Sequence, residues 1–367
     1  MNNIARIIAF YLPQYHPIPE NNAWWGKGFT EWTNVGKAKP LFPGHKQPKI
    51  PTDLGYYDLR LIDNIKEQVK LAKDAGIEGF CWWHYYFGNG KMLLEKPLRM
   101  VLNDKSVDFP FCLGWANESW EKKLWNKDSI GNTILIEQEY GGKEDYRQHF
   151  EIVLPYFKDS RYIKVDGKPL FFIYRPQRIP DCKQFISYWR KWAVEELNTD
   201  IHFVAKADEL DNDFEEYYNW GFDGVFSNRV LAGARIHQNS LQNRLRYITC
   251  KLLGLPRLVN FKEVIKHAQN KYDEKEGVYP GILCGWDHSP RSGRKGIVIY
   301  NFTMRLFAKH ISEIFELVKN KNLEHRIIFL KSWNEWGEGN FMEPDMEFGH
   351  GKINTLKHCL EKSGKIF

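Results

Sequence analysis

Two glutamates, Glu335 and Glu338, stand three residues apart in the segment Arg326–Asp345, which reads RIIFLKSWNEWGEGNFMEPD. On one helical turn this spacing would aim both carboxyls the same way. Two carboxyls held close cannot both ionise freely, so one pKa should rise, as general acid/base chemistry requires. Trp333 and Trp336 offer flat apolar planes for a sugar ring. The pattern predicts sugar chemistry; the structural alternative is two solvated glutamates beside two core tryptophans.

The strand that must position this pair is the apolar run just before it, which is the last of eight along the chain. Helical patterns separate most of these runs, and this alternation favours a (β/α)8 TIM barrel over an open doubly wound sheet. No GxGxxG or GxxxxGK[ST] motif follows any run, which counts against a nucleotide-binding sheet. The expected strands are Ile4–Leu12, Gly79–Trp83, Phe109–Trp115, Leu170–Tyr174, His202–Ala205, Gly224–Phe226, Gly281–Gly285 and Arg326–Lys331.

The helices expected between these strands are Asp58–Ala75, Leu93–Asn103, Asp145–Lys158, Cys182–Leu197, Asp213–Trp220 and Phe302–Asn320. The whole chain, 1–367, is interpreted as one catalytic domain.

Two segments depart from the alternation. The first is a long loop after the first strand, residues 13–51, rich in Pro, Gly and Trp, and too long for a simple connection. The second is a basic insertion between the sixth and seventh strands, residues 227–279, with helical patterns at Leu241–Leu253 and Phe261–Tyr272. The insertion is either a solvated helical cap or a patch for peripheral contact with an anionic glycan or a membrane carrying one.

Composition narrows the class of protein. The net charge, 52 − 46 = +6, is too small to indicate a nucleic-acid partner, and 14 Trp favour ring-shaped ligands. No secretory signal pattern and no apolar run long enough to span a membrane is evident. The six cysteines are scattered without a CxxC pair, which indicates reduced, buried thiols in a cytoplasmic protein, with neither a zinc site nor a disulfide framework.

Residues just past the strand ends of a parallel barrel share one face, where catalysis occurs. Aromatic, amide and charged side chains dominate there, as expected of a sugar site. A metal site is disfavoured, because His84, Asp208, Asp287 and His288 show no HxH or HExxH spacing. Glu118 is an alternative second carboxylate, which would lie about 5–5.5 Å from Glu335 in a two-carboxylate retaining enzyme. The predicted substrate contacts are Tyr11, Trp82, Trp83, His84, Trp115, Asn117, Glu118, Tyr174, Arg175, Lys206, Asp208, Trp286, Asp287, Arg291, Trp333, Asn334 and Trp336, with Gln14 and Asn228 on the same rim.

The motif SWNEWGEGNFMEPD resembles the last-strand signature of glycoside hydrolase family 99, whose members cleave mannosides internally. The whole chain resembles still more closely the WbsX family, which is counted as family-99-like and often labelled glycosyltransferase or lipopolysaccharide biosynthesis protein. The segments that carry this resemblance span nearly the whole chain: AFYLPQYHPIPENNAWWGKGFTEWTNV, GFCWWHYYF, FCLGWANESW, GKPLFFIYRP and GWDHSPR.

The resemblance implies a (β/α)8 barrel and a site without metal or cofactor. It implies that Glu335 is the base that deprotonates the sugar 2-hydroxyl, giving a 1,2-anhydro intermediate, and that Glu338 is the acid/base, for which a raised pKa is expected. Glu31, in FTEWTNV, is expected to reach into the site. Family 99 has His where this chain has Gly337, so mannose specificity is not carried over.

Three functions remain open at this point. The first is a retaining glycoside hydrolase acting on a bacterial surface polysaccharide such as O-antigen or capsule. The second is a glycosyltransferase of surface polysaccharide biosynthesis that uses the same two acids; the missing phosphate loop counts against a nucleotide-sugar donor, although a lipid-linked donor survives that objection. The third is a non-catalytic glycan-binding barrel, which would not need two adjacent acids.

Overall fold

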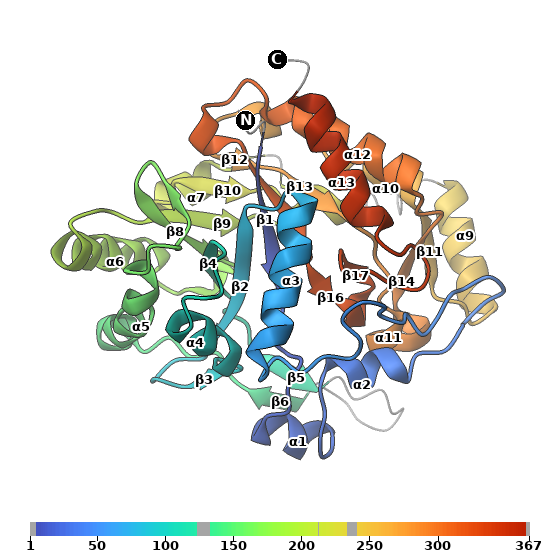
Figure 1. Cartoon of the computed structure of the whole chain (residues 1–367), viewed down its shortest axis with the longest axis horizontal. Coiled ribbons are helices and arrows are strands. Elements are labelled where there is room, and N and C mark those ends of the chain that lie inside the picture. The colour runs from blue at the N-terminus through green and yellow to red at the C-terminus, as the bar shows by residue number, and fades with distance from the viewer. Residues whose placement is uncertain (1–4, 123–132, 212, 233–240, 365–367) are drawn as a thin grey trace.

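Parallel strands curl into a barrel with helices around its outside (Figure 1). The computed structural model describes residues 5–122, 133–211, 213–232 and 241–364, so Ile4 of the first expected strand lies outside the described residues. The strands follow the spatial order β12-β10-β9-β8-β4-β2-β1-β15-β13. Their bounds are β1 Arg6–Tyr11, β2 Gly79–Tyr86, β4 Phe111–Trp115, β8 Lys168–Ile173, β9 His202–Lys206, β10 Gly224–Phe226, β12 Val278–Tyr279, β13 Gly281–Leu283 and β15 Ile327–Lys331.

The barrel closes through Pro280. β12 pairs with β10 and β13 pairs with β15, both in parallel, and only Pro280 separates Tyr279 from Gly281. Proline has no N–H, so the ladder is interrupted there, but its carbonyl still accepts a hydrogen bond from the Phe329 N–H at 3.0 Å. β12 and β13 are thus two halves of one strand, and the nine strands occupy eight barrel positions. The predicted (β/α)8 fold is confirmed.

The helices that pack outside the sheet largely follow the predicted alternation. α6 has the predicted bounds, whereas α13, after the last strand, was not predicted. α3 ends where Gly76 adopts a left-handed conformation, φ 79°, which glycine tolerates without strain. The bounds are α3 Ile62–Ala75, α4 Lys96–Asn103, α5 Gly142–Phe157, α6 Cys182–Leu197, α7 Glu215–Trp220, α12 Met304–Val318 and α13 Gly351–Ser363.

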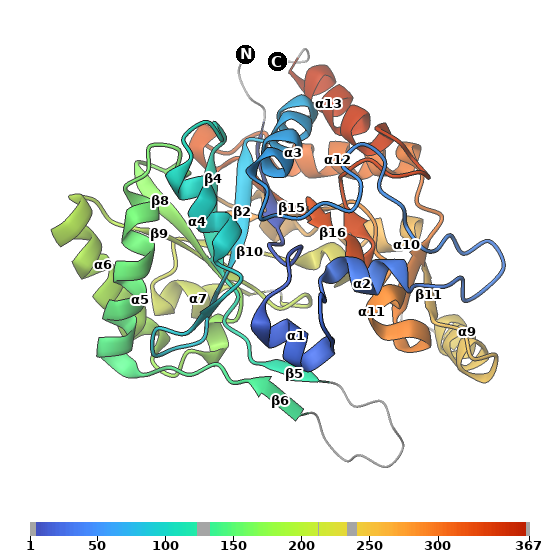
Figure 2. The same ribbon diagram turned by 60° about the horizontal axis from the view of Figure 1, so that its bottom comes forward.

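Several short elements gather at the end of the barrel where the strands finish (Figure 2). The long loop after β1 contains two helices, and a hairpin takes the start of the helix predicted from Leu93. The bounds are α1 Pro19–Trp25, α2 Glu31–Gly36, β3 Met92–Leu93, β5 Trp120–Lys122, β6 Thr133–Ile136 and α11 Ser289–Ser292. At the opposite end of the barrel, β7 (Lys164–Val165) forms a hairpin with the start of β8.

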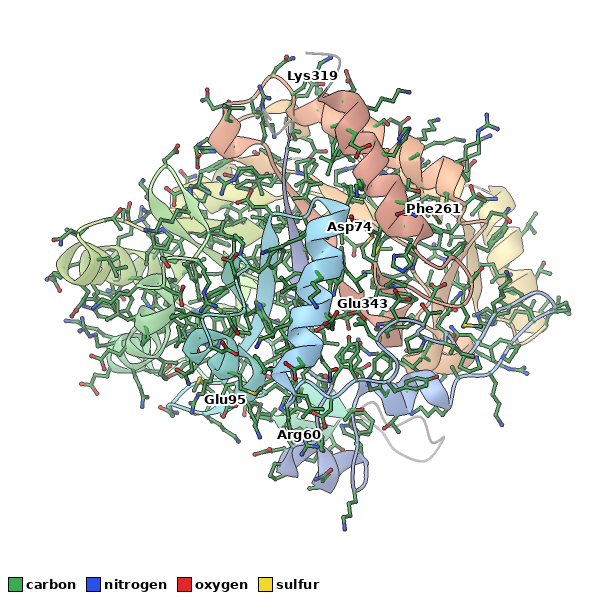
Figure 3. The ribbon with its side chains drawn as sticks, viewed as in Figure 1. Arg60, Asp74, Glu95, Phe261, Lys319 and Glu343 are labelled. Atoms are coloured by element: carbon green, nitrogen blue, oxygen red, sulfur yellow. The ribbon has the colours of Figure 1, made fainter. Side chains whose placement is uncertain are left out.

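The insertion between β10 and β12 holds α9 (Leu241–Leu252), β11 (Arg257–Asn260), α10 (Phe261–Ile265) and a 3-10 turn at Lys271–Glu274. Its residues 233–240 lie outside the described residues. The predicted helix over 261–272 ends at Ile265, because Asn270 starts a new turn by accepting the Tyr272 N–H. β11 pairs with β14 (Ile297–Tyr300), which ties the insertion to the chain after the seventh strand. Phe261, at the start of α10, is fully buried in the small core beneath it (Figure 3).

An aromatic layer fills the barrel. The Phe10 ring lies 4.7 Å from Trp83, 5.0 Å from Phe172 and 5.2 Å from Phe329, with Phe226 at 5.7 Å. These side chains come from several different strands and pack against one another in one layer inside the barrel. The layer forms a solid floor beneath the carboxyl ends of the strands.

Two further findings bear on composition. All six cysteines are free and buried. Within the described ranges, no helix combines the length and apolar character needed to cross a bilayer.

Candidate functional site

A cavity of about 650 Å³ opens above the aromatic floor, at the carboxyl ends of the strands. Active sites of (β/α)8 enzymes lie at this end. Of the predicted site residues, those that line the cavity are Glu31, Trp83, Glu118, Tyr174, Arg175, Lys206, Asp208, Trp286, Arg291, Glu335 and Glu338, together with Gln14 and Asn228.

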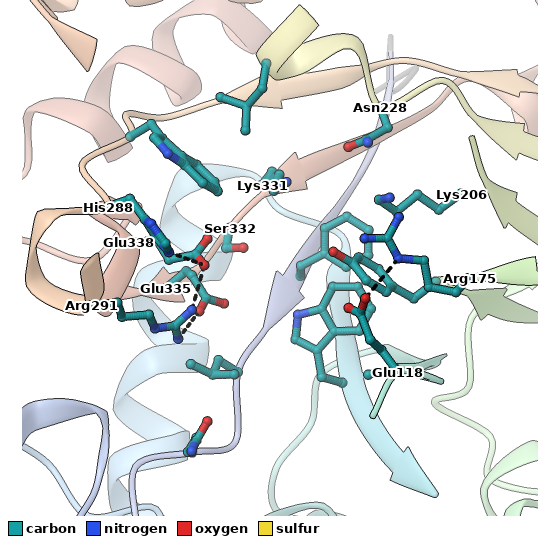
Figure 4. A pocket seen from close by; sticks show the side chains of 18 of the residues that line it. Glu118, Arg175, Lys206, Asn228, His288, Arg291, Lys331, Ser332, Glu335 and Glu338 are labelled. Atoms are coloured by element: carbon teal, nitrogen blue, oxygen red, sulfur yellow. Dashed lines mark hydrogen bonds and ion pairs between the residues drawn. The ribbon is translucent and has the colours of Figure 1, made fainter. Parts of the chain in front are cut away.

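One guanidinium binds three carboxylates on one wall of this cavity. Arg291 Nη2 lies 2.6 Å from Glu335 Oε1, and Nη1 lies 2.6 Å from Glu338 Oε1 (Figure 4). Arg291 Nη2 is also 3.0 Å from Glu31 Oε2, and its Nε donates to the same oxygen at 3.1 Å. Glu31 and Glu335 are buried, and Arg291 is about three-quarters buried. The two acids of the motif therefore do face the same way.

The chain after β15 folds back on itself to hold the two acids. Asn334–Glu335 (β16) pairs with Asn340–Phe341 (β17), and a 3-10 turn, Trp336–Glu338, connects them. Asn334 locks this turn to β1, because its amide exchanges hydrogen bonds of 2.8 and 3.0 Å with the Leu12 backbone. Trp336 stacks on Phe341 at 3.7 Å, so its indole supports the turn from behind.

A buried carboxylate, Glu343, supports the same turn. It accepts hydrogen bonds from Trp336 Nε1 at 2.5 Å, Gln68 Nε2 at 2.6 Å and the Tyr57 hydroxyl at 3.0 Å. Gln68 belongs to α3, so Glu343 joins the turn to that helix (Figure 3). Burial raises the pKa of Glu343 to about 7, although these donors oppose the rise. Glu343 acts on the site through Trp336 and does not line the cavity.

Glu31 reaches Arg291 through the space that Gly337 leaves. Glu31 is the first residue of α2, and the Thr30 side chain caps that helix. A Cβ built on Gly337 would overlap Glu31 Oε2 and lie 3.0 Å from Arg291 Nε. The third carboxylate thus occupies the place of a side chain at position 337.

α11 brings Arg291 to the acids, and Asp287 holds α11 in place. The Asp287 carboxylate accepts hydrogen bonds from the Ser289 N–H at 3.0 Å and Gln47 at 2.6 Å, and lies 2.8 Å from His45. Burial tends to raise the pKa of Asp287, but these contacts hold it below its usual range. Asp287 is therefore a positioning residue.

The two acids of the motif differ in proton affinity. Burial, together with the charges of Glu338 and Glu31, raises the pKa of Glu335 to about 7 despite Arg291. Burial also tends to raise the pKa of Glu338, but Arg291 and His288 outweigh it and lower that pKa to about 2. The expectation that Glu338 carries the raised pKa is therefore wrong: the raised pKa is that of Glu335, and the pKa of Glu338 is lowered.

The opposite wall carries cations of its own. Arg175 Nε lies 3.5 Å from Glu118 Oε1 (Figure 4), and Arg178 Nη2 lies 3.6 Å from the same oxygen. Glu118 is therefore engaged across the cavity from the acid pair. This position gives no support to the alternative in which Glu118 and Glu335 work as a close pair.

The other predicted contact residues lie behind the cavity lining. Successive side chains of a strand point to opposite faces. Tyr11 and Trp82 contact each other at 3.9 Å outside the barrel, where the Tyr11 hydroxyl donates to Gln68. Their neighbours Phe10 and Trp83 point inward instead. The expectation of a shared rim does not hold for Tyr11, Trp82, His84, Trp115, Asn117, Asp287, Trp333, Asn334 and Trp336.

Lining residues that the sequence reasoning missed include Phe10, Tyr85, Trp120, His288 and Lys331. Strict alternation could have found Phe10 and Tyr85, each next to a residue that was chosen. Trp120 comes from the β5–β6 hairpin, which no periodicity in the sequence predicts.

A metal site has little support from the side chains. His84 Nε2 lies 2.9 Å from His149 Nε2 in a buried pair, and Asp287 is bound by His45. Across the described part of the chain, no three His, Cys, Asp or Glu side chains are arranged as ligands for a metal ion.

Comparison with known proteins gives a family. The profile of the family described as Glycosyltransferase WbsX matches residues 7–356. The uncharacterized protein WxcX of Xanthomonas campestris pv. campestris is 34% identical over 370 residues, covering 99% of this chain and 50% of its own length. The chain therefore spans about half the length of the curated relatives it matches.

Solved structures share the fold at low sequence identity. A protein described as glycoside hydrolase-like aligns with a TM-score of 0.63 at 13% identity, over 98% of this chain and 94% of its own. The GH99 endo-alpha-mannosidase from Bacteroides thetaiotaomicron, in complex with BIS-TRIS-propane, aligns with a TM-score of 0.57 at 14% identity, over 100% and 98% of the two chains.

Replacing Arg291 by Met tests the carboxylate cluster. Removing the guanidinium leaves three carboxylates without their cation, which should destabilise the fold by about 3–5 kcal/mol at pH 8. Without the cation, the folded variant keeps protons on Glu335 and Glu338 above their ordinary pKa of 4.5, whereas the unfolded chain releases them. The stability of the variant should therefore fall as the pH rises, so the loss should be smaller at pH 5.

Chemical denaturation at pH 5 and pH 8 measures this difference. The matched control is Arg147→Met, which removes surface ion pairs with Glu151 and Glu196 and should change stability by less than about 1 kcal/mol at either pH. An Arg291→Met loss of the same size at both pH values would contradict the assigned charge balance.

Proposed function

The chain belongs to the WbsX family, and from this premise we propose that it is a carbohydrate-active enzyme: a retaining glycoside hydrolase acting on a bacterial surface polysaccharide. The observation that carries the proposal is the pairing of Glu335 and Glu338 through Arg291 in an aromatic-floored cavity. Two carboxyls whose pKa values are pulled apart are the usual equipment of glycoside hydrolysis. A binding barrel without turnover has no need of such a pair.

The proposed first step uses the substrate's own hydroxyl. Glu335 takes the proton of the sugar 2-hydroxyl, O2 forms a bond to the anomeric carbon, and the bond from that carbon to the leaving oxygen breaks. Glu338 gives its proton to the leaving oxygen. A pKa of about 7 suits Glu335 as a base at neutral pH, since proton transfer is most efficient when the pKa lies near the working pH.

The second step reverses the roles. Water attacks the anomeric carbon, Glu338 takes its proton, the bond to O2 breaks and Glu335 returns a proton to O2. Both steps invert the anomeric carbon, so the product retains configuration. Glu338 must hold a proton in the first step, so we propose that bound sugar draws Arg291 away from Glu338 and thereby raises its pKa.

A second candidate is transfer, favoured by the family's description as a glycosyltransferase. The same anhydro intermediate gives transfer when an acceptor hydroxyl replaces water in the second step.

We also propose a cytoplasmic location and a peripheral contact through the insertion. Six free, buried thiols support a reducing, cytoplasmic setting. α9 of the insertion exposes Leu245, Ile248 and Leu252 beside Lys251, which supports a peripheral contact with an anionic glycan or membrane.

Incubation with a panel of bacterial surface polysaccharides should release oligosaccharides that chromatography and mass spectrometry detect. Glu338→Gln should lower this release by a factor of about 10²–10⁴, because it removes proton transfer to the leaving oxygen, while sugar binding persists. Glu144→Gln, exposed at the start of α5, is the control and should keep full turnover. Full turnover by Glu338→Gln would remove Glu338 from the mechanism, and an added acceptor that appears in longer products would indicate transfer.

The pH dependence of kcat/KM tests the proton count of the acid pair. The reactive form of the free enzyme holds one proton on Glu335 and Glu338 together, and this proton is lost as the pH rises through about 7, so kcat/KM should be level just below pH 7 and fall about tenfold per pH unit above it. Steady-state rates between pH 5 and pH 9 measure this limb. A kcat/KM that rises with pH through 7 would mean that the reactive pair holds no proton, and it would contradict the role of Glu338 as the acid.

A substrate without the 2-hydroxyl can be used to test whether O2 attacks the anomeric carbon in the first step. For any glycoside that the enzyme cleaves, the matched 2-deoxy glycoside should bind but remain uncleaved, because no O2 is present to attack the anomeric carbon. Product analysis of both compounds under equal conditions measures this. Normal cleavage of the 2-deoxy compound would refute the anhydro route and leave direct attack on the anomeric carbon.

A further inference from the structure

Two lysines project into the cavity, and one of them, Lys331, is close enough to Glu338 for its charge to help lower the pKa of that acid. Lys206 ends β9 and Lys331 ends β15, and both line the cavity (Figure 4). Lys206 is only 6% exposed, and its ammonium lies 4.4 Å from the centre of the Tyr174 ring. The Lys331 ammonium lies 5.0 Å from the centre of the Trp286 ring.

Among the residues that the structure describes, neither ammonium forms an ion pair. Within the described ranges, no carboxylate oxygen lies within 4.0 Å of either lysine nitrogen. Glu118 and Asp208 each lie 3.5 Å from Arg175, and Glu338 is paired with Arg291. These acids are therefore paired with the two arginines, and the two lysines face the cavity without an ion pair to any described residue.

Other buried lysines in this chain are satisfied by the protein itself. Lys352 Nζ donates to the Phe341 carbonyl at 2.7 Å and lies 3.5 Å from Asp345. Lys321 Nζ donates to the Val278 carbonyl. A buried cation without such partners is unfavourable, so Lys206 departs from the rule that this fold otherwise follows.

We propose that Lys206 and Lys331 form a subsite for the carboxylate or phosphate of an acidic sugar unit in the substrate. The proposal rests on the proposed function only in that the cavity takes carbohydrate. The charge distribution supports it: three carboxylates share one guanidinium on the acid wall, so an anionic substituent is repelled there and attracted to the lysines. The subsite would thereby fix which way round the substrate lies.

The electrostatics of Lys206 agree with this role. Burial, with the charges of Arg175 and Lys331, lowers the pKa of Lys206 to about 7. An anion between the two ammonium groups would reverse the effect of the charges, so binding above pH 7 should take up protons.

Ligand-observed NMR titration of the full chain tests the subsite. The probes are methyl glucuronide and methyl galacturonide, each against its neutral glucoside or galactoside, with glucose 1-phosphate and inorganic phosphate as further arms. Wild type should bind the better acidic probe about tenfold more tightly than its neutral counterpart, as a charge-assisted hydrogen bond provides. The uronide and phosphate arms show which anionic group is the natural one.

Lys206→Met and Lys331→Met should each reduce this preference to twofold or less without changing the affinity for the neutral sugar. Lys206→Met should also melt at or above the wild-type temperature, because the lost ammonium had no ion pair. Lys183→Met, an exposed position on α6, is the matched control and should keep the preference.

Equal affinity for acidic and neutral sugars in wild type would overturn the subsite, as would a preference that survives in the double variant. Inorganic phosphate that binds as tightly as glucose 1-phosphate would also overturn it, since the site would then recognise a bare anion. The titration involves no bond cleavage, so its outcome is independent of hydrolysis. A preference without turnover would refute only the hydrolase, and turnover without a preference would refute only the subsite.

Discussion

The ion contacts between Arg291 and three carboxylates are the constraint on which this molecule's active end depends. Glu31, Glu335 and Glu338 come from a loop near the amino terminus and from the turn after the last strand, and Arg291 comes from a short helix after the seventh. Three buried negative charges would repel one another without the guanidinium. Each of these segments is stable in its position only when the others bring the opposite charge next to it. The cluster therefore joins Glu31 and Arg291, which are 260 residues apart in the chain.

Behind this cluster lies a second layer that is polar but closed to the cavity. The Glu343 carboxylate accepts hydrogen bonds from Trp336, Gln68 and Tyr57. The Asp287 carboxylate accepts one from Gln47 and contacts the His45 ring. Buried carboxylates of this kind are tolerated because their oxygens are satisfied. They hold the acid-bearing turn and α11 at fixed positions, and this explains why a motif rich in indole and amide groups serves mainly as a scaffold for its two glutamates.

The barrel was predictable because buried parallel strands are continuous apolar runs, and such runs can be read from sequence. The direction in which individual side chains point was harder to predict. Trp82 and Trp83 look alike in sequence, but only Trp83 faces the barrel interior. The pKa order of Glu335 and Glu338 was not predictable, since it depends on where Arg291 and His288 come to rest. The helices inside residues 13–51 were missed because they are too short for periodicity to reveal.

The bare backbone at Gly337 links two distant positions of the chain. Any larger residue there would occupy the volume that the Glu31 carboxylate now fills, so the third acid can exist only with glycine at the centre of the motif. Substitutions at 31 and 337 should consequently be paired in evolution, and an engineer who transplants the acid-bearing turn into another barrel must move α2 with it.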